Sequence, residues 1–143
     1  MDLPDHILLK PLIQKINSHV KVVSKKMGYQ DKIKPECVRY WINSNNAKEI
    51  VEPHLHPNVQ LACVYYPLAD ENVSVIKFMN PVQQVQYAIE SKNIVNWNEY
   101  NSTAWTIKPI TNGLIIFPAW LLHYVVGKNV SERLSIAFNY VLN

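Results

Sequence analysis

The sequence has few glycines, few charges and no long apolar run. Of its 143 residues, 3 are Gly and 17% are charged, against roughly 25% charged residues in an ordinary soluble domain. The longest apolar runs, residues 114–117 and 119–122, are far shorter than the about 20 residues needed to cross a bilayer, so no membrane partner is expected. Apolar residues nevertheless make up 48%, which excludes intrinsic disorder and is enough for a buried core.

Cysteine is equally scarce. Cys37 and Cys63 are too few for a disulfide framework and lack the spacing of a metal motif. The first residues are acidic and no apolar segment follows them, so a secretory signal is not indicated and a cytoplasmic location is expected. The net charge is only +3, and a basic stretch over residues 21–34 is interpreted as a solvated helix face. Nucleic acid is therefore not indicated as a partner.

Two periodicities divide the chain. Between Pro4 and Met27, apolar residues recur every three or four positions, which predicts an amphipathic helix that stops before Gly28. After about residue 35 the pattern changes to short β-rich runs separated by Pro, Asn and Gly, which is typical of a sandwich or barrel. Strands are predicted at residues 38–43, 60–66, 73–79, 103–108, 114–117, 121–126 and 134–142.

Two connections between these runs are distinctive. Asn112-Gly113 predicts a two-residue hairpin turn, which requires positive φ at both positions. Residues 80–100 have no clear period and predict a long excursion with a helical turn around residues 82–89. The whole chain, residues 1–143, is expected to form one domain with its N-terminal helix (about 4–27) packed on the barrel.

Three of the five histidines stand where strand geometry can bring them together. His54 and His56 are two residues apart, so in an extended backbone both imidazoles leave the same face. Taken alone, the pair is a weak motif and is more typical of a polar strand edge.

The C-terminal part of the chain gives this pair its context. His123 lies in a strand-like run, and Arg133 follows ten residues later. In the strand predicted after Arg133, alternation puts Arg133, Ser135 and Asn139 on one polar face. An arginine with a hydroxyl two residues on can hold a carboxylate through charge-assisted hydrogen bonds, although a surface arginine on an amphipathic strand fits the pattern equally well.

The order His-x-His, a distant His and an Arg ten residues later resembles the 2-oxoglutarate/Fe(II)-dependent oxygenase superfamily. More narrowly, it resembles a group of small oxygenases of marine bacteria and tailed phages. The resemblance covers most of the chain from about Val38 onwards, and the block from Gly113 to Asn139 is its most specific part. The matching stretches are residues 40–43, 53–58, 62–66, 113–123 and 133–139.

The resemblance implies a mainly β fold with an N-terminal helix, a double-stranded β-helix (a jelly roll or cupin-like barrel) with metal and cosubstrate inside its open end. Position by position, it makes His54 and His123 ligands of Fe(II). It pairs Arg133 with the distal carboxylate of 2-oxoglutarate, and it gives Ser135 and Tyr66 hydrogen bonds to the same carboxylate. It implies no catalytic residue beyond the metal centre.

The third ligand departs from the superfamily pattern. Where that pattern has Asp or Glu, this chain has His56, and three imidazoles bind Fe(II), Zn(II) or Cu(II). Glu52, two residues before His54, is expected on the ligand face as a replacement carboxylate or as a group behind the ligands. Ligand preference and reach favour His56. Asn43 and Asn139, at inward-facing strand positions, are further candidates for orienting cosubstrate or water.

The function implied by the resemblance is a 2-oxoglutarate- and Fe(II)-dependent dioxygenase that uses dioxygen to hydroxylate an unactivated C–H bond of an unidentified substrate. Two alternatives stay open. One is a three-His cupin-type metal dioxygenase that does not use 2-oxoglutarate, and the other is a degenerate, non-catalytic barrel that serves as a binding or structural module. The low charge content favours self-association, so a homodimer is one expected state. If a phage encodes the protein, its cytoplasmic location is that of the host.

Overall fold

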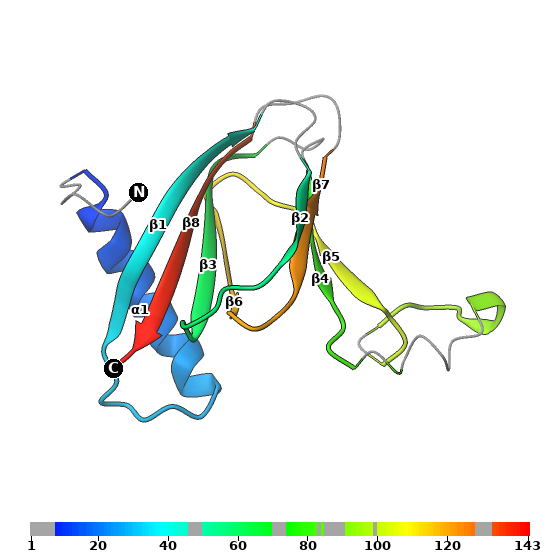
Figure 1. Ribbon diagram of the computed structural model, residues 1–143, viewed down its shortest axis with the longest axis horizontal. Helices are drawn as coiled ribbons and strands as arrows, with labels where there is room; N and C mark the ends of the chain where they lie inside the picture. The colour runs from blue at the N-terminus through cyan, green and yellow to red at the C-terminus, as the bar shows by residue number, and fades with distance from the viewer. Residues whose placement is uncertain are drawn as a thin grey trace.

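The computed structural model describes residues 8–45, 50–69, 74–82, 84, 91–98, 100–127 and 133–143. Within these residues the chain forms one α-helix, α1 (Lys10–Lys26), one short 3-10 helix, η1 (Ser91–Asn93), and two four-stranded sheets (Figure 1). The major sheet has the order β1 (Pro35–Asn45), β8 (Arg133–Leu142), β3 (Leu61–Ala69) and β6 (Gly113–Pro118). The minor sheet has the order β2 (Val51–His54), β7 (His123–Val126), β4 (Val75–Met79) and β5 (Ala104–Ile107).

The strand order joins the two ends of the chain. The first strand, β1, pairs with the last, β8, and β2 pairs with β7. Both pairs are antiparallel, as are the other pairs of the two sheets. The sheets face each other, close together where β1 leads toward β2 and splayed apart at the opposite end (Figure 1). This is a mainly β fold with an N-terminal helix and the jelly-roll arrangement that was predicted.

Helix α1 covers the outer face of the major sheet (Figure 1). Its residues Ile16 and Val20 are 2% and 0% exposed, and they pack with the equally buried Phe138 and Tyr140 of β8. The opposite face of the major sheet is therefore the one that is turned toward the minor sheet, because successive residues of a strand alternate between faces.

The helix begins later than predicted. Residues 1–7 lie outside the described residues, residues 8 and 9 form a turn, and α1 starts at Lys10 rather than at Pro4. Pro11 takes the place expected for Pro4, in the first turn, where the missing N–H of proline costs no hydrogen bond. The end of the helix agrees with the prediction, since Gly28 has φ 87° and terminates it.

Each of the predicted β-runs contains a strand, but β2 was missing from them. This strand is only four residues long and includes Pro53. It lies at the edge of the minor sheet, and a proline is tolerated there because the outer side of an edge strand faces no neighbouring strand and needs no N–H donor. A short edge strand with a proline lacks the apolar alternation by which strands are recognised in a sequence.

The predicted hairpin at Asn112-Gly113 is wrong. β5 pairs with β4 and β6 pairs with β3, so the connection crosses from one sheet to the other. Asn112 has φ 63°, but Gly113 has no positive φ, and its N–H donates to the Ile110 carbonyl. Glycine is needed at position 113 for a different reason, because a Cβ there would lie 2.8 Å from the Ile110 carbonyl oxygen.

Between β4 and β5, the described residues 91–98 contain η1 and lie away from both sheets (Figure 1). Apart from residues 82 and 84, the helical turn predicted over residues 82–89 lies outside the described residues. In the part of the chain that the structure describes, no helix combines the length and the apolar character that a membrane span requires.

Two valines of α1 provide a matched test of this packing. Val20 is fully buried against the major sheet, whereas Val22 is 56% exposed. We expect Val20→Ala to lower the free energy of unfolding by about 1–3 kcal/mol, because two buried methyl groups are removed. Val22→Ala should change it by less than about 0.5 kcal/mol. Urea unfolding measures both, and equal effects would contradict the described packing of α1.

Candidate metal centre

The pairing of β2 with β7 brings two distant histidines together. His54 lies directly opposite His123 in this pair, and their ring centroids are 4.3 Å apart. His56 follows β2 and stacks on His123 with a centroid distance of 5.1 Å. One possible ligand nitrogen from each of the three rings lies within 4.8 Å of the others. The three predicted metal ligands therefore meet at one point.

Two of these imidazoles are oriented by backbone carbonyls. The Nδ1 of His54 lies 2.8 Å from the Glu52 carbonyl oxygen, and the Nδ1 of His123 lies 2.9 Å from the Leu121 carbonyl oxygen. A carbonyl only accepts, so each Nδ1 carries the hydrogen and each Nε2 keeps its lone pair. A hydrogen bond of this kind to the far ring nitrogen fixes the tautomer in metal-binding histidines.

The spacing of the nitrogens fits a single ion. The Nε2 atoms of His56 and His123 are 3.3 Å apart. Two nitrogens that each lie about 2.1 Å from one ion, at an angle of about 90–110°, are about 3.0–3.4 Å apart. The residues present therefore fit a transition metal held by neutral imidazoles, and such a donor set suits Fe(II), Zn(II) or Cu(II).

The surroundings favour the uncharged form of two of these imidazoles, His56 and His123. His123 is 3% exposed, and its ring contacts Phe78 and Phe117 at centroid distances of 5.8 Å and 4.7 Å. Burial lowers the pKa of His56 to about 4, and the neighbouring His123 and His54 contribute to the decrease. Burial also lowers the pKa of His123. Neutral rings are the form that binds metal, so protons compete little for these two rings near neutral pH.

The histidines line a cavity of about 90 Å³ between the two sheets. The minor sheet provides His54 and His123, the residues after β2 provide His56, and the facing strands of the major sheet provide Arg133, Ser135 and Tyr66. Asn43, the cross-strand partner of Ser135, lines the cavity too. Among the described residues that line it, Arg133 is the one with a permanent charge and none carries a carboxylate.

The major-sheet side of the cavity is deeply buried. Arg133, Ser135 and Tyr66 are 5%, 3% and 1% exposed. Burial raises the pKa of Tyr66 to about 12, and the charge of Arg133 opposes this rise only in part. The phenol therefore keeps its proton and can donate a hydrogen bond at neutral pH. The guanidinium of Arg133, the hydroxyl of Ser135 and the phenol of Tyr66 can each donate a hydrogen bond to an anion.

Glu52 is placed differently from the expectation. Its side chain is exposed and does not line the cavity, whereas Val51 and His54 both do. The reason is an irregular register between Val51 and His54, which breaks the alternation that would have put Glu52 on the ligand face. What Glu52 contributes is its backbone carbonyl, which orients His54.

Asn43 and Asn139 both lie on the inner face of the major sheet, but in different places. Asn43 lines the cavity beside Ser135. Asn139 is 8% exposed and lies one inward-facing position beyond Ala137, the last cavity residue of β8. Its Oδ1 is buried without a hydrogen-bond partner.

Comparison with known proteins bears on this site. A family model described as "Putative 2OG-Fe(II) oxygenase" matches residues 39–139, well over half of the chain. The chain belongs to this 2OG-Fe(II) oxygenase family. The matched residues include the three histidines and Arg133. The narrower likeness to oxygenases of marine bacteria and phages stays a prediction.

A solved structure has a similar fold. The crystal structure of an oxidoreductase of the 2OG-Fe(II) oxygenase family from Burkholderia pseudomallei matches with a TM-score of 0.55 and 13% sequence identity. The match covers 77% of this chain and 46% of that chain, so this chain spans less than half the length of that protein. At this identity the likeness concerns the fold. No curated protein matches the sequence significantly.

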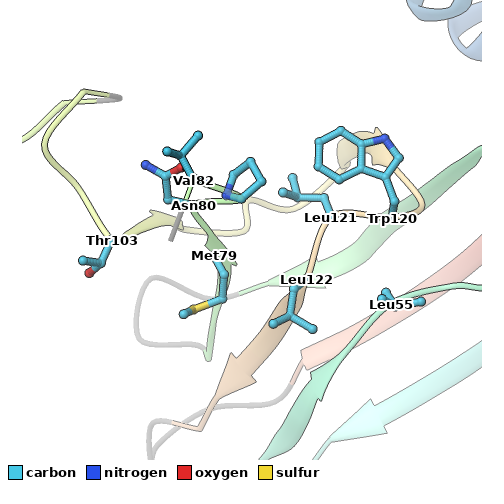
Figure 2. A pocket seen from close by; sticks show the side chains of 9 residues that line it. Leu55, Met79, Asn80, Val82, Thr103, Trp120, Leu121 and Leu122 are labelled. Atoms are coloured by element: carbon cyan, nitrogen blue, oxygen red, sulfur yellow. The ribbon is translucent and has the colours of Figure 1, made fainter. Parts of the chain in front are cut away.

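A larger apolar pocket of about 540 Å³ is distinct from the oxygenase-family site (Figure 2). It is lined by Leu55, Met79, Asn80, Pro81, Val82, Thr103, Trp120, Leu121 and Leu122. Leu55 separates the two histidines of the His-x-His motif, and Leu122 precedes His123, so these leucines leave the opposite side of the extended chain. None of the lining side chains is titratable or a usual metal ligand, so this pocket does not compete as the metal centre.

Some features of this oxygenase-family site were not predicted from the sequence. The carbonyls of Glu52 and Leu121 were missed because a backbone group has no sequence signature. Trp41 was not among the predicted site residues, yet its ring lies 5.7 Å from that of His56 and it lines the cavity. Its signal was available, because alternation puts Trp41 on the same face as Asn43.

The lowered pKa of His56 makes the stability of the metal-free protein depend on pH. As the pH falls below about 6.5, the unfolded chain binds a proton at this residue before the folded protein does. The free energy of unfolding should therefore decrease from about pH 6.5 to about pH 4, and His56→Asn should make this decrease smaller. Urea unfolding in the presence of a chelator measures it. His19→Asn, on the exposed side of α1, is the control. Identical pH profiles for all three proteins would contradict the assignment.

Proposed function

We propose that the protein is a 2-oxoglutarate- and Fe(II)-dependent dioxygenase that hydroxylates an unactivated C–H bond of its substrate. The observation that carries this proposal is the composition of one cavity. Three convergent imidazoles line its minor-sheet side, and the buried Arg133 lines its major-sheet side. His54, His56 and His123 would hold the iron, while Arg133 would hold the far end of the cosubstrate.

Charge supports a dianionic cosubstrate. A divalent ion held by the three imidazoles would place positive charge at one end of the cavity, and the Arg133 guanidinium places it at the other. Buried charges are tolerated when they are paired. 2-Oxoglutarate carries a keto acid that can bind the metal and a second carboxylate that can pair with Arg133, so it neutralises both ends of the cavity.

Each major-sheet residue has a specific part in this pairing. Arg133 donates through a planar fork that matches a carboxylate. Ser135 stands two residues further along β8, on the same face, and its hydroxyl can donate to the same group. Tyr66 donates as well, because its raised pKa keeps the phenol protonated. Their burial removes competing water, which strengthens each of these hydrogen bonds.

The chain's own residues prepare the site before any metal arrives. The carbonyls of Glu52 and Leu121 hold the rings of His54 and His123 in position, and burial favours the neutral form of His56 and His123. When bound, Fe(II) with 2-oxoglutarate supplies the oxidising chemistry that transfers an oxygen atom from dioxygen to a C–H bond. The protein would hold this ion through three ligands only, which would leave coordination positions open for the cosubstrate and dioxygen.

The three-His donor set favours one alternative, a cupin-type dioxygenase that binds its substrate directly on the metal and does not use 2-oxoglutarate. The two functions differ in what they require of Arg133. A cupin-type enzyme has no need for a cation at the far end of the cavity, whereas a 2-oxoglutarate enzyme depends on it. The burial of Arg133 beside Ser135 and Tyr66 supports the 2-oxoglutarate enzyme.

Arg133→Ala tests this difference. We expect the wild-type protein to develop a metal-to-ligand charge-transfer band when Fe(II) and 2-oxoglutarate are added together without oxygen. Arg133→Ala should bind iron normally but bind 2-oxoglutarate at least about 30-fold more weakly, because a buried charge pair loses one partner. Titration of the band measures the dissociation constant.

Two further variants serve as controls for Arg133→Ala. Arg133→Lys keeps the charge but not the fork and should lie between the wild-type protein and Arg133→Ala. Lys108→Ala removes an exposed charge and should bind like the wild-type protein. Thermal unfolding checks that each variant is folded. A wild-type protein that binds iron without giving the band would favour the cupin-type enzyme, and one that binds no iron would favour the non-catalytic barrel.

His56→Asp tests the third ligand. A carboxylate at position 56 adds one negative charge to the donor set, which lowers the Fe(III)/Fe(II) potential and should make oxygen activation easier. The variant should retain iron and produce succinate faster than the wild-type protein when no substrate is present. Iron analysis and succinate assays measure the two effects. Loss of iron, or an unchanged rate, would contradict the argument that the imidazole limits oxygen activation.

A further inference from the structure

The inner face of the major sheet continues beyond the metal centre. Trp41 of β1 and Ala137 of β8 are cross-strand partners, and both line the cavity. The next inward-facing pair in the direction away from Arg133 consists of Arg39 and Asn139. Arg133 and this pair therefore lie on opposite sides of the Trp41–Ala137 level, at which the Trp41 ring contacts His56. A substrate that approaches the metal from this side meets Arg39 and Asn139.

Asn139 has hydrogen-bonding capacity that the protein does not use. The residue is 8% exposed, and its Oδ1 is buried without a partner. Buried side-chain amides in native proteins are nearly always hydrogen-bonded, and the exceptions point to a functional role or an absent ligand. The two amide atoms exchange places by rotation of the side chain, so the group can offer either a donor or an acceptor to a ligand.

The positive charge of Arg39 has no negatively charged partner among the described residues. The residue is exposed, and within the described part of the chain no ion pair or side-chain hydrogen bond engages its guanidinium. A charged residue on an edge strand such as β1 also discourages sheet-to-sheet association, which is the simplest reason for its presence. That reason does not explain why the cation lies directly opposite Asn139, whose Oδ1 has no hydrogen-bond partner, on the face that leads to the metal centre.

We propose that Arg39 and Asn139 select the substrate, and that this substrate carries a carboxylate or a phosphate next to a group that hydrogen-bonds with an amide. This inference rests on the proposed dioxygenase function. Arg39 pairs with the anion, and Asn139 binds the neighbouring polar group. Because one inward-facing step along a strand is about 7 Å, the anion is held about that far from the level of the metal centre, and the oxidised C–H bond lies on the near side of it.

Matched pairs of probes test the proposal. N-acetylated amino acids and their methyl esters form the carboxylate arm, and nucleoside 5′-monophosphates and their nucleosides form the phosphate arm. Each probe is added to the protein with Fe(II) and 2-oxoglutarate under anaerobic conditions, and the shift in melting temperature gives the dissociation constant. In at least one arm the anion should bind ten-fold or more tightly than its neutral partner. Under oxygen, the same anion should accelerate consumption of 2-oxoglutarate.

Three variants connect this preference to the two residues. Arg39→Gln should reduce the preference for the anion to less than about two-fold, because a neutral amide replaces the cation. Arg39→Lys should keep most of the preference, and Asn139→Asp should weaken binding of the anion by adding a like charge. Lys108→Gln removes an exposed charge elsewhere and should leave the preference intact. Arg39 is exposed, so its variants should fold normally.

The outcomes separate this inference from the function on which it rests. If the charge-transfer band forms but neutral and anionic probes bind alike, or if neither binds in either arm, the substrate-selection proposal fails and the dioxygenase assignment stands. Retention of the preference in Arg39→Gln overturns the proposal as well. If the band never forms, the dioxygenase function fails first, whatever the probes do.

Discussion

The pairing of β2 with β7 is the contact on which the site depends. It places His54 opposite His123, although 69 positions of sequence separate them, and it positions the chain so that His56 reaches the same point. The strands are short, with four residues each. Their alignment is reinforced locally, because each of the paired histidines is tied to a carbonyl of its own strand or of the turn before it. Backbone geometry therefore brings the residues of the candidate metal centre together.

The second constraint is that the two sheets contribute different kinds of side chain to the cavity. The three histidines line the cavity on the side of the minor sheet, and Arg133, Ser135 and Tyr66 line it on the side of the major sheet. Because β8 pairs with both β1 and β3, Arg133 and Ser135 lie in the interior of the major sheet and are held by neighbours on both sides. Helix α1 covers the outer face of the same sheet, so its residues contribute to the site only through support.

Much of this could be predicted from the sequence, for identifiable reasons. The period-2 pattern located most strands, and the family resemblance carried by His54, His56, His123 and Arg133 indicated residues that line the cavity. The misses have physical causes as well. β2 has a proline and no apolar alternation, so it has no strand signal. The Asn112-Gly113 turn was misjudged because a crossing between sheets uses the same residues as a hairpin. Glu52 was misplaced because a register irregularity is invisible in the sequence.

The distribution of ligands over both sheets has a mechanical consequence. A molecule that binds the imidazoles at one end and Arg133 at the other contacts both sheets, and it therefore restricts the movement of one sheet relative to the other. Occupancy of the cavity would then slow amide hydrogen exchange in β8 and β7 together, although these two strands belong to different sheets. Rigidity of the sandwich would thus become a property of the loaded protein rather than of the polypeptide alone.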